Sequence, residues 1–354
     1  MKTPSYKYAF VYITPLIVLL SIYSKNYWSF SAVAIIFMII PFLELFTKGS
    51  TDNLNTLQED IAKENKLYDW LIYGLVPLQY LILIYFLFQV SDASLPFYFK
   101  LGATTAFGMA CGILGINAAH ELGHRTTWYE QLMSKILLLT TLYMHFFIEH
   151  NRGHHRHVST EIDPASARFG ETVYAFYFRS IGGSWISAWH LESEKLKRKN
   201  LPFWSTKNEM LVFQIVQILL IVCIWLVFGG TTLLFFLLGS LMGILLLETV
   251  NYIEHYGLRR KKTGDHYERT MPIHSWNSNH PIGRLILLEL SRHSDHHFIA
   301  NRKYQILRHF NESPQMPTGY PGMLLLSLLP PLWFKVMHNR IAAYKQTQKG
   351  VELA

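Results

Sequence analysis

The sequence is poor in cysteine and in charge. Two of its 354 residues are cysteines, which excludes a disulfide scaffold, an iron–sulfur cluster or a thiolate zinc finger held by this chain alone. Charged residues make up 16% of the chain, compared with about 25% in an average soluble protein. Half of the residues are apolar and the mean hydropathy is +0.16, which is too high for a disordered or nucleic-acid-coating chain. The composition indicates a membrane protein that is rich in histidine, with 17 of these residues.

Six apolar runs are close to the length needed to cross a hydrocarbon core about 30 Å thick, which is about 20 residues. Short connectors at Lys25–Tyr27, Ser91–Pro96 and Gly229–Gly230 join them in pairs. We therefore predict an all-α integral membrane protein with six transmembrane helices arranged as three hairpins, forming a single domain over residues 1–354. The predicted spans are Tyr8–Ser24, Trp28–Phe46, Leu71–Val90, Phe97–Ala119, Met210–Phe228 and Thr231–Val250.

Two further apolar runs are not counted as spans. Leu132–Phe147 is short and carries a lysine, and Met323–Met337 is interrupted by Pro330–Pro331, so the second reads as an interfacial segment. The first predicted span lacks a small-residue cleavage site and continues into a second span, so we expect a retained helix and not a signal peptide.

The basic residues predict the orientation. Six spans place both termini on one side, together with 30 of the 32 lysines and arginines, leaving only Lys25 and Lys100 elsewhere. Positive residues accumulate on the cytoplasmic side, so both termini and the long polar regions 120–208 and 251–354 are expected there as a histidine-rich cap. The net charge of +8 is thus explained by topology, and no nucleic-acid partner is expected.

Histidines cluster at four places, each close to the cytoplasmic end of a span or in the cap. Histidines at positions i and i+4 of a helix lie on the same face, so both rings can reach one metal ion. Two of the clusters, His120–His124 and the one around His255, lie at the ends of inward-running spans. The candidate ligands are His120, His124, His150, His154, His155, His255, His293, His296 and His297.

Nine imidazoles in this arrangement predict a metal centre. Neutral imidazole suits iron, zinc, copper or nickel. A single zinc ion needs only three or four ligands, so nine suit two metal ions. Without metal, so many buried rings would leave polar groups unsatisfied. Glu149, Glu254 and Asp295 lie beside histidines and are candidates for orienting the rings through their second nitrogen. The other eight histidines are expected to pack, cap helices or lie at the surface.

Other metal-dependent functions fit the pattern less well. His120-Glu121-x-x-His124 matches the zinc-protease motif, but that reading leaves at least six clustered histidines unused. A carboxylate-bridged di-iron bundle needs paired Glu-x-x-His motifs, of which only Glu121–His124 has the spacing. A metal transporter would place ionisable residues deep within its spans. The predicted spans hold few of these, and they lie towards the span ends.

A pair of metals held by neutral ligands beside a membrane suits activation of dioxygen for attack on an apolar substrate that enters from the bilayer. The sequence carries no flavin, nicotinamide or haem motif, so electrons are expected to come from a separate protein.

Four motifs resemble those of the membrane alkane 1-monooxygenase family: His120–His124, Glu149–His155, Asn251–Gly257 and Arg292–His297. The resemblance is strong from His120 to Pro317 and covers the amino-terminal hairpins by architecture only. It implies a non-haem centre of two iron ions bound by the nine histidines. It also implies terminal hydroxylation of medium- or long-chain alkanes, with electrons from rubredoxin and rubredoxin reductase, in the bacterial inner membrane.

The sequence departs from the family pattern at two places. Arg125 follows the first motif where lysine is common, and Phe298-Ile299-Ala300 follows the last where Ala-Asn-Pro is frequent. Both departures leave the candidate ligands in place but bear on the substrate. Xylene monooxygenases share most of the motifs, and fatty-acyl desaturases or lipid hydroxylases share three of them more loosely. An aromatic methyl group and a fatty-acyl chain therefore stay as alternative substrates.

Overall fold

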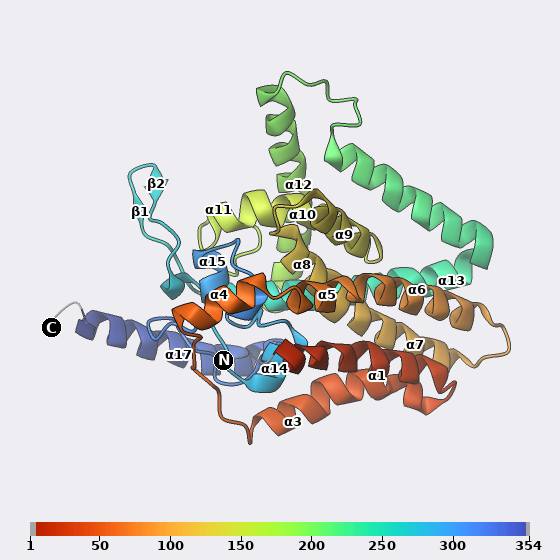
Figure 1. Cartoon of the computed structure of the whole chain (residues 1–354), viewed down its shortest axis with the longest axis horizontal. Coiled ribbons are helices and arrows are strands. Elements are labelled where there is room, and N and C mark those ends of the chain that lie inside the picture. The colour runs from red at the N-terminus through yellow and green to blue at the C-terminus, as the bar shows by residue number, and fades with distance from the viewer. Residues whose placement is uncertain (1–4, 352–354) are drawn as a thin grey trace.

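Long apolar helices form most of the amino-terminal half of the protein. The structure, a computed structural model, describes residues 5–351. Four helical stretches run beside one another, with the cap at one end of them (Figure 1). They comprise η1 (Ser5–Tyr12) with α1 (Ile13–Tyr23); η2 (Tyr27–Phe30), α2 (Ser31–Ala34), η3 (Ile35–Ile39) and α3 (Ile40–Glu44); α5 (Leu67–Tyr73) with α6 (Leu75–Ser91); and α7 (Phe97–Ala110), η4 (Cys111–Ile116) and α8 (Asn117–Gly123).

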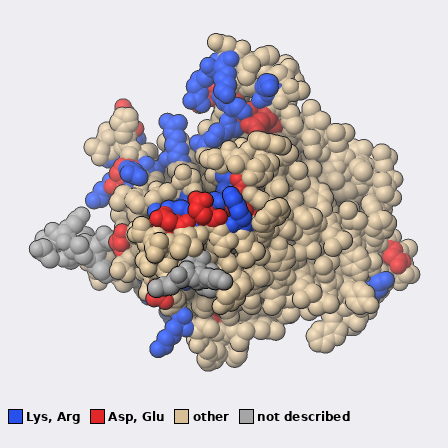
Figure 2. Space-filling model, in the orientation of Figure 1, with Lys and Arg blue, Asp and Glu red and all other residues tan. Residues whose placement is uncertain are grey.

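Five helices of the described chain are long and apolar enough to cross a membrane by length and composition. The fifth is α13 (Glu209–His255), and the other four are Ser5–Tyr23, Tyr27–Glu44, Leu67–Ser91 and Phe97–Gly123. The visible face of the molecule carries almost no charged side chains over these helices, whereas charges gather over the cap (Figure 2). An uncharged belt of this kind is expected for a multi-pass membrane protein.

The last two predicted spans are the two arms of one element. Helix α13 has 47 residues and a break at Gly229, where φ is 80° and ψ is 171°. This backbone conformation is essentially restricted to glycine, because a Cβ atom would clash with the backbone. The second arm turns back from the first at this point (Figure 1). The two arms contain the fifth and sixth predicted spans, and the predicted Gly229–Gly230 connector is a break at Gly229.

Close packing of α7 and η4 against the second arm of α13 holds the centre of the molecule together. A Cβ atom added at Gly243 would lie 2.5 Å from Cβ of Cys111, and one added at Gly239 would lie 2.6 Å from the Phe107 ring. Small residues let two helix backbones approach each other in this way. The contact brings two helix ends together, the one that carries His120 and the one that carries His255.

Short helices and loops build the cap around these two ends. Helix α15 lies near α8, α10 and α11, although it is distant from them in sequence (Figure 1). The interrupted run at Met323–Met337 is divided between two helices, since α17 begins at Pro330. The cap elements are α4 (Thr56–Glu64), α9 (Trp128–Leu139), α10 (Phe146–Glu149), η5 (His150–His154), α11 (His155–His157), α12 (Val173–Arg198), β1 (Lys262–Thr263), β2 (His266–Tyr267), η6 (Pro272–His274), α14 (Pro281–Ile286), α15 (His293–Phe298), η7 (Tyr304–Ile306), α16 (Tyr320–Ser327) and α17 (Pro330–Val351).

Candidate metal centre

The nine predicted histidines lie in two adjoining groups in the described part of the chain. Within each group, the ring nitrogens that could bind metal all lie within 4.8 Å of one another. The other eight histidines belong to neither group. The five-histidine group consists of His120, His124, His150, His155 and His296, and the four-histidine group of His154, His255, His293 and His297.

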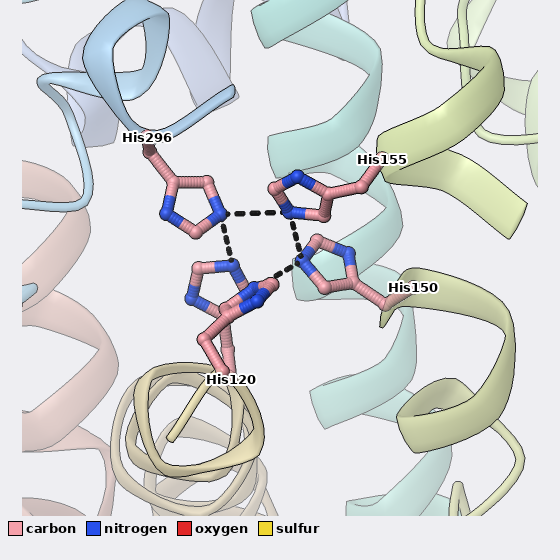
Figure 3. A group of neighbouring side chains, drawn as sticks. His120, His150, His155 and His296 are labelled. Carbon is pink, nitrogen blue, oxygen red and sulfur yellow. Dashed lines mark hydrogen bonds between the residues drawn. The ribbon is translucent and has the colours of Figure 1, made fainter. Parts of the chain in front are cut away.

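The rings of the five-histidine group point their Nε2 atoms toward a common centre, as the four labelled rings in Figure 3 show. The Nε2 atom of His296 lies 2.9 Å from that of His120 and 3.0 Å from that of His155. The Nε2 atom of His150 lies 3.1 Å from that of His155 and 3.0 Å from that of His124. Two nitrogens bound to one ion at about 2.1 Å with a right angle between the bonds are about 3.0 Å apart.

The four-histidine group has the same spacing and adds a carboxylate. The Nε2 atoms of His154 and His297 are 3.2 Å apart, as are those of His255 and His293. One oxygen of Glu254 lies 3.1 Å from Nε2 of His293, and the other accepts a hydrogen bond of 2.8 Å from the Tyr320 hydroxyl. Glu254 is therefore placed where it could join the ligands of this group.

Burial keeps the rings neutral. The pKa of His124 is lowered to about 3 by burial. Burial, followed by the neighbouring rings, also holds the pKa of His150, His293, His296 and His297 well below the usual value. A metal ion binds the neutral imidazole, so these surroundings favour the form that can act as a ligand.

A π-helical turn decides which histidines of the second motif, Glu149–His155, belong to which of the two groups. In η5, each turn is wider than in an α-helix, with hydrogen bonds from residue i to i+5. His150 and His155, five residues apart, consequently point into the same group, whereas His154 points into the other. The sequence offers His150 two partners at helical spacing, His154 at i+4 and His155 at i+5, and the structure groups it with His155. In the α-helical α15, His293 and His297 do share a group.

The three predicted ring-orienting carboxylates have different surroundings. Glu254 contacts a candidate ligand, but at the Nε2 side of the ring and not at its second nitrogen. Buried Glu149 accepts a hydrogen bond of 3.4 Å from Ser187. Asp295 accepts from the Arg302 side chain at 3.0 Å and from the Arg308 backbone at 2.7 Å. These two contacts show that Asp295 anchors the loop that follows it.

A carboxylate that the sequence analysis missed has the orienting position. An oxygen of Asp163 lies 2.9 Å from Nδ1 of His154, the nitrogen opposite Nε2. Burial alone would raise the pKa of Asp163, but its contacts with His154 and Ser166 lower it. Carboxylates at this position fix the ring and increase its basicity as a ligand. In the sequence, Asp163 begins a short stretch, Asp163–Ala165, that supports the family resemblance, but neither this nor its place nine residues after His154 assigns it the orienting role.

An apolar cavity leads to both groups. Its wall includes the rings of His120, His150 and His293, together with Glu254. None of its lining residues is lysine or arginine. Most of the apolar wall comes from η3, α3, η4, α13, α14 and α16, and it includes Ile36, Phe37, Ile40, Ile113, Ile116, Leu246, Leu247, Ile286 and Leu324.

Replacement of Asp163 tests whether the four-histidine group binds metal. We expect Asp163→Ala to weaken the affinity for one of the bound metal ions by about 10–100-fold, because His154 loses the group that orients it. Equilibrium dialysis against buffered cobalt(II) measures this affinity. Glu161→Ala is the matched control, since Glu161 lies two residues away with 78% of its side chain exposed. Equal affinity of both variants would contradict the assignment.

Comparison with known proteins agrees with the two histidine groups. Residues 94–327 match the family model described as fatty acid desaturase. The chain is 39% identical over 318 residues to the alkane 1-monooxygenase of Acinetobacter baylyi, covering 90% of this chain and 78% of that protein. It is 40% identical over 325 residues to alkane 1-monooxygenase 1 of Pseudomonas aeruginosa, covering 90% and 84%. A xylene/toluene monooxygenase hydroxylase component of Pseudomonas putida is 30% identical over 240 residues, covering 67% and 63%.

The histidine groups and the family together indicate a metal site. The chain belongs to the alkane 1-monooxygenase family, within the wider fatty acid desaturase family.

Proposed function

We propose that the protein is a membrane alkane 1-monooxygenase in which the nine histidines hold two non-haem iron ions. It hydroxylates the terminal carbon of a medium- or long-chain alkane with dioxygen and two electrons delivered by rubredoxin. The observation that carries this proposal is the convergence of nine histidine rings in groups of five and four, three of which line an apolar cavity. The relatives named alkane 1-monooxygenase cover most of the chain and support the same reaction.

Imidazole nitrogens with one adjacent carboxylate fit iron, which imidazole suits among the transition metals. When bound, two iron ions supply the reduction of dioxygen that makes attack on an unactivated C–H bond feasible. The side chains of the protein would hold the ions at the end of the apolar cavity. Glu254 shares its charge with the four-histidine group while its second oxygen stays on the Tyr320 hydroxyl.

The cavity suits a substrate without a charged head. Its wall is mainly isoleucine, leucine and phenylalanine, and its polar part is limited to the histidines, Glu254, Tyr320, Asn117 and Asn251. Burying a carboxylate or phosphate there without a cationic partner would be costly. This favours an alkane over a free fatty acid or an acyl-CoA. The alkyl chain would lie along the apolar wall with its end at the histidines, which accounts for attack at the terminal carbon.

The zinc-protease alternative is disfavoured by the position of Glu121. This carboxylate would have to act as a general base on water at the metal. Instead it accepts a hydrogen bond of 2.7 Å from buried Arg125 and one of 3.3 Å from the Tyr304 backbone. His120 and His124 also share their group with three further histidines.

The membrane arrangement follows the same proposal. We infer that both arms of α13 cross the membrane, so that both termini and the histidine groups lie on the cytoplasmic side of the bacterial inner membrane. The excess of lysine and arginine on that side supports this orientation. The alkane enters from the bilayer, and rubredoxin, reduced by its reductase, reaches the cap from the cytoplasm.

Isotope labelling tests the reaction. The iron-loaded protein in nanodiscs, supplied with rubredoxin, rubredoxin reductase and 18O2, is expected to convert a mixture of n-alkanes to 1-alcohols that carry one 18O atom. Gas chromatography with mass spectrometry identifies the products. Parallel incubations contain xylene and a fatty-acyl substrate. Unsaturated acyl products without 18O, or oxidation of xylene alone, would contradict alkane hydroxylation.

Filling the cavity tests whether the alkane lies in it. Ile113 precedes His120 by seven residues, about 10 Å along a helix at 1.5 Å per residue. We expect Ile113→Trp to shorten the longest alkane that is hydroxylated, while short alkanes keep most of their turnover. Leu226→Trp, on the exposed side of the first arm of α13, is the control and is expected to leave the range of chain lengths unchanged. Product profiles from the same alkane mixture measure the shift, and an unaltered profile for Ile113→Trp would place the substrate elsewhere.

A further inference from the structure

A second space, an open and polar hollow, reaches the five-histidine group at His124, a ring that does not line the apolar cavity. His120 and His150 lie on the wall of the apolar cavity, whereas His124 lies on the wall of an open hollow. His124 is partly exposed, while His120 and His150 are buried. The group is therefore accessible by two separate routes, one apolar and one polar.

Basic side chains dominate the hollow. Its wall carries four basic residues, Arg125, Arg152, Lys195 and Arg198, and one acidic residue, Glu209. The amides of Gln131 and Asn151 and the backbone around Ala300 and Asn301 complete its polar lining. A surface of this composition suits a partner with carboxylates on its contact face.

Two basic residues in the wall of the hollow are held in place by ion pairs. Arg125 lies 2.7 Å from Glu121 and 3.3 Å from Asp69. Lys195 lies 2.9 Å from Glu192 and 2.7 Å from Glu209. These pairs hold the wall rigid beside His124 but leave it with little net charge.

The rim of the hollow, around Arg198 at the end of α12, supplies positive charge that is not neutralised. Exposed Arg198 donates to the backbone oxygen of Glu194, and it has no carboxylate within ion-pair distance in the part of the chain that the structure describes. Its neighbours Lys197 and Lys199 are exposed as well. Figure 2 shows lysine and arginine side chains gathered over this end of α12. The charge is exposed and therefore available for steering a partner.

We propose that this hollow is the docking site of a small acidic electron-transfer protein and that electrons enter the five-histidine group through His124. The proposal rests on the proposed function, because a monooxygenase that consumes dioxygen and two electrons needs such a donor. Each docking event passes one electron, oxidising the donor by one electron and reducing the metal centre by one. Two events supply the reaction RH + O2 + 2e− + 2H+ → ROH + H2O.

The other basic segment of the cap fits a donor less well. Arg259 pairs with Glu161 at 3.5 Å, and Arg260 donates to backbone oxygens, including that of Arg156 at 2.9 Å. The adjoining strands β1 and β2 form a hairpin that projects away from α8 (Figure 1).

Charge reversal on the rim tests the docking site. Lys197→Glu/Arg198→Glu changes the rim, and Lys261→Glu/Lys262→Glu makes the same change of net charge at the hairpin. Reduced rubredoxin is mixed anaerobically with each iron-loaded protein in phosphatidylcholine nanodiscs, and its oxidation is followed by absorbance. We expect the second-order rate constant at low ionic strength to fall about tenfold or more for the rim variant and less than about twofold for the hairpin variant. The affinity of rubredoxin for each metal-free protein, measured by calorimetry, is expected to follow the same order.

Further measurements distinguish failure of the docking proposal from failure of the proposed function. Lys197→Gln/Arg198→Gln is expected to lose an intermediate amount, and reduction by dithionite with a viologen mediator is expected to be equally fast in all variants. Equal losses for rim and hairpin would overturn the proposal, as would slower chemical reduction of the rim variants. A loss seen only with anionic phosphatidylglycerol would identify a lipid headgroup as the occupant and overturn it too. Failure of alkane turnover with intact rubredoxin binding would instead count against the proposed function alone.

Discussion

The meeting of nine imidazole rings is the constraint on which the rest of the structure depends. Imidazole nitrogens about 3 Å apart cannot all be satisfied by hydrogen bonds among themselves, because each neutral nitrogen is either a donor or an acceptor, so their convergence is best explained by cations that share them. The rings come from four segments, and the contact between His120 and His296 spans 176 residues of sequence. Close packing at Gly239 and Gly243 holds the ends of α8 and α13 at the required separation. The helices thus serve as the frame that places the rings.

Two environments meet at this centre and divide the work of the enzyme. On one side the cavity is apolar and lies among the long helices, where it can take up a substrate that dissolves in the bilayer. On the other side the hollow at His124 is polar and basic. Separate access lets a water-insoluble substrate and a soluble electron donor reach the same centre without competing for space. The ion pairs of Arg125 and Lys195 lie on the polar side.

The sequence predicted the nine histidines because each lies in a short motif, and it predicted the long helices because apolar length is a local property. It did not predict how His150, His154 and His155 are divided, since that depends on a π-helical turn whose hydrogen bonds do not show in the residue pattern. Asp163 was missed because its relation to His154 depends on the path of the intervening loop. The break at Gly229 was read as a connector, since two glycines mark a turn without revealing its geometry.

Iron analysis of the purified protein tests the central claim most directly. Elemental analysis is expected to find about two irons per chain in the native protein and a clear loss in His255→Ala, because the four-histidine group then lacks one of its rings. Exposed His190, on α12, belongs to neither group, and His190→Ala is expected to retain the full content. A single zinc ion that is unaffected by the loss of His255 would contradict the account and point to a centre built on His120 and His124 alone.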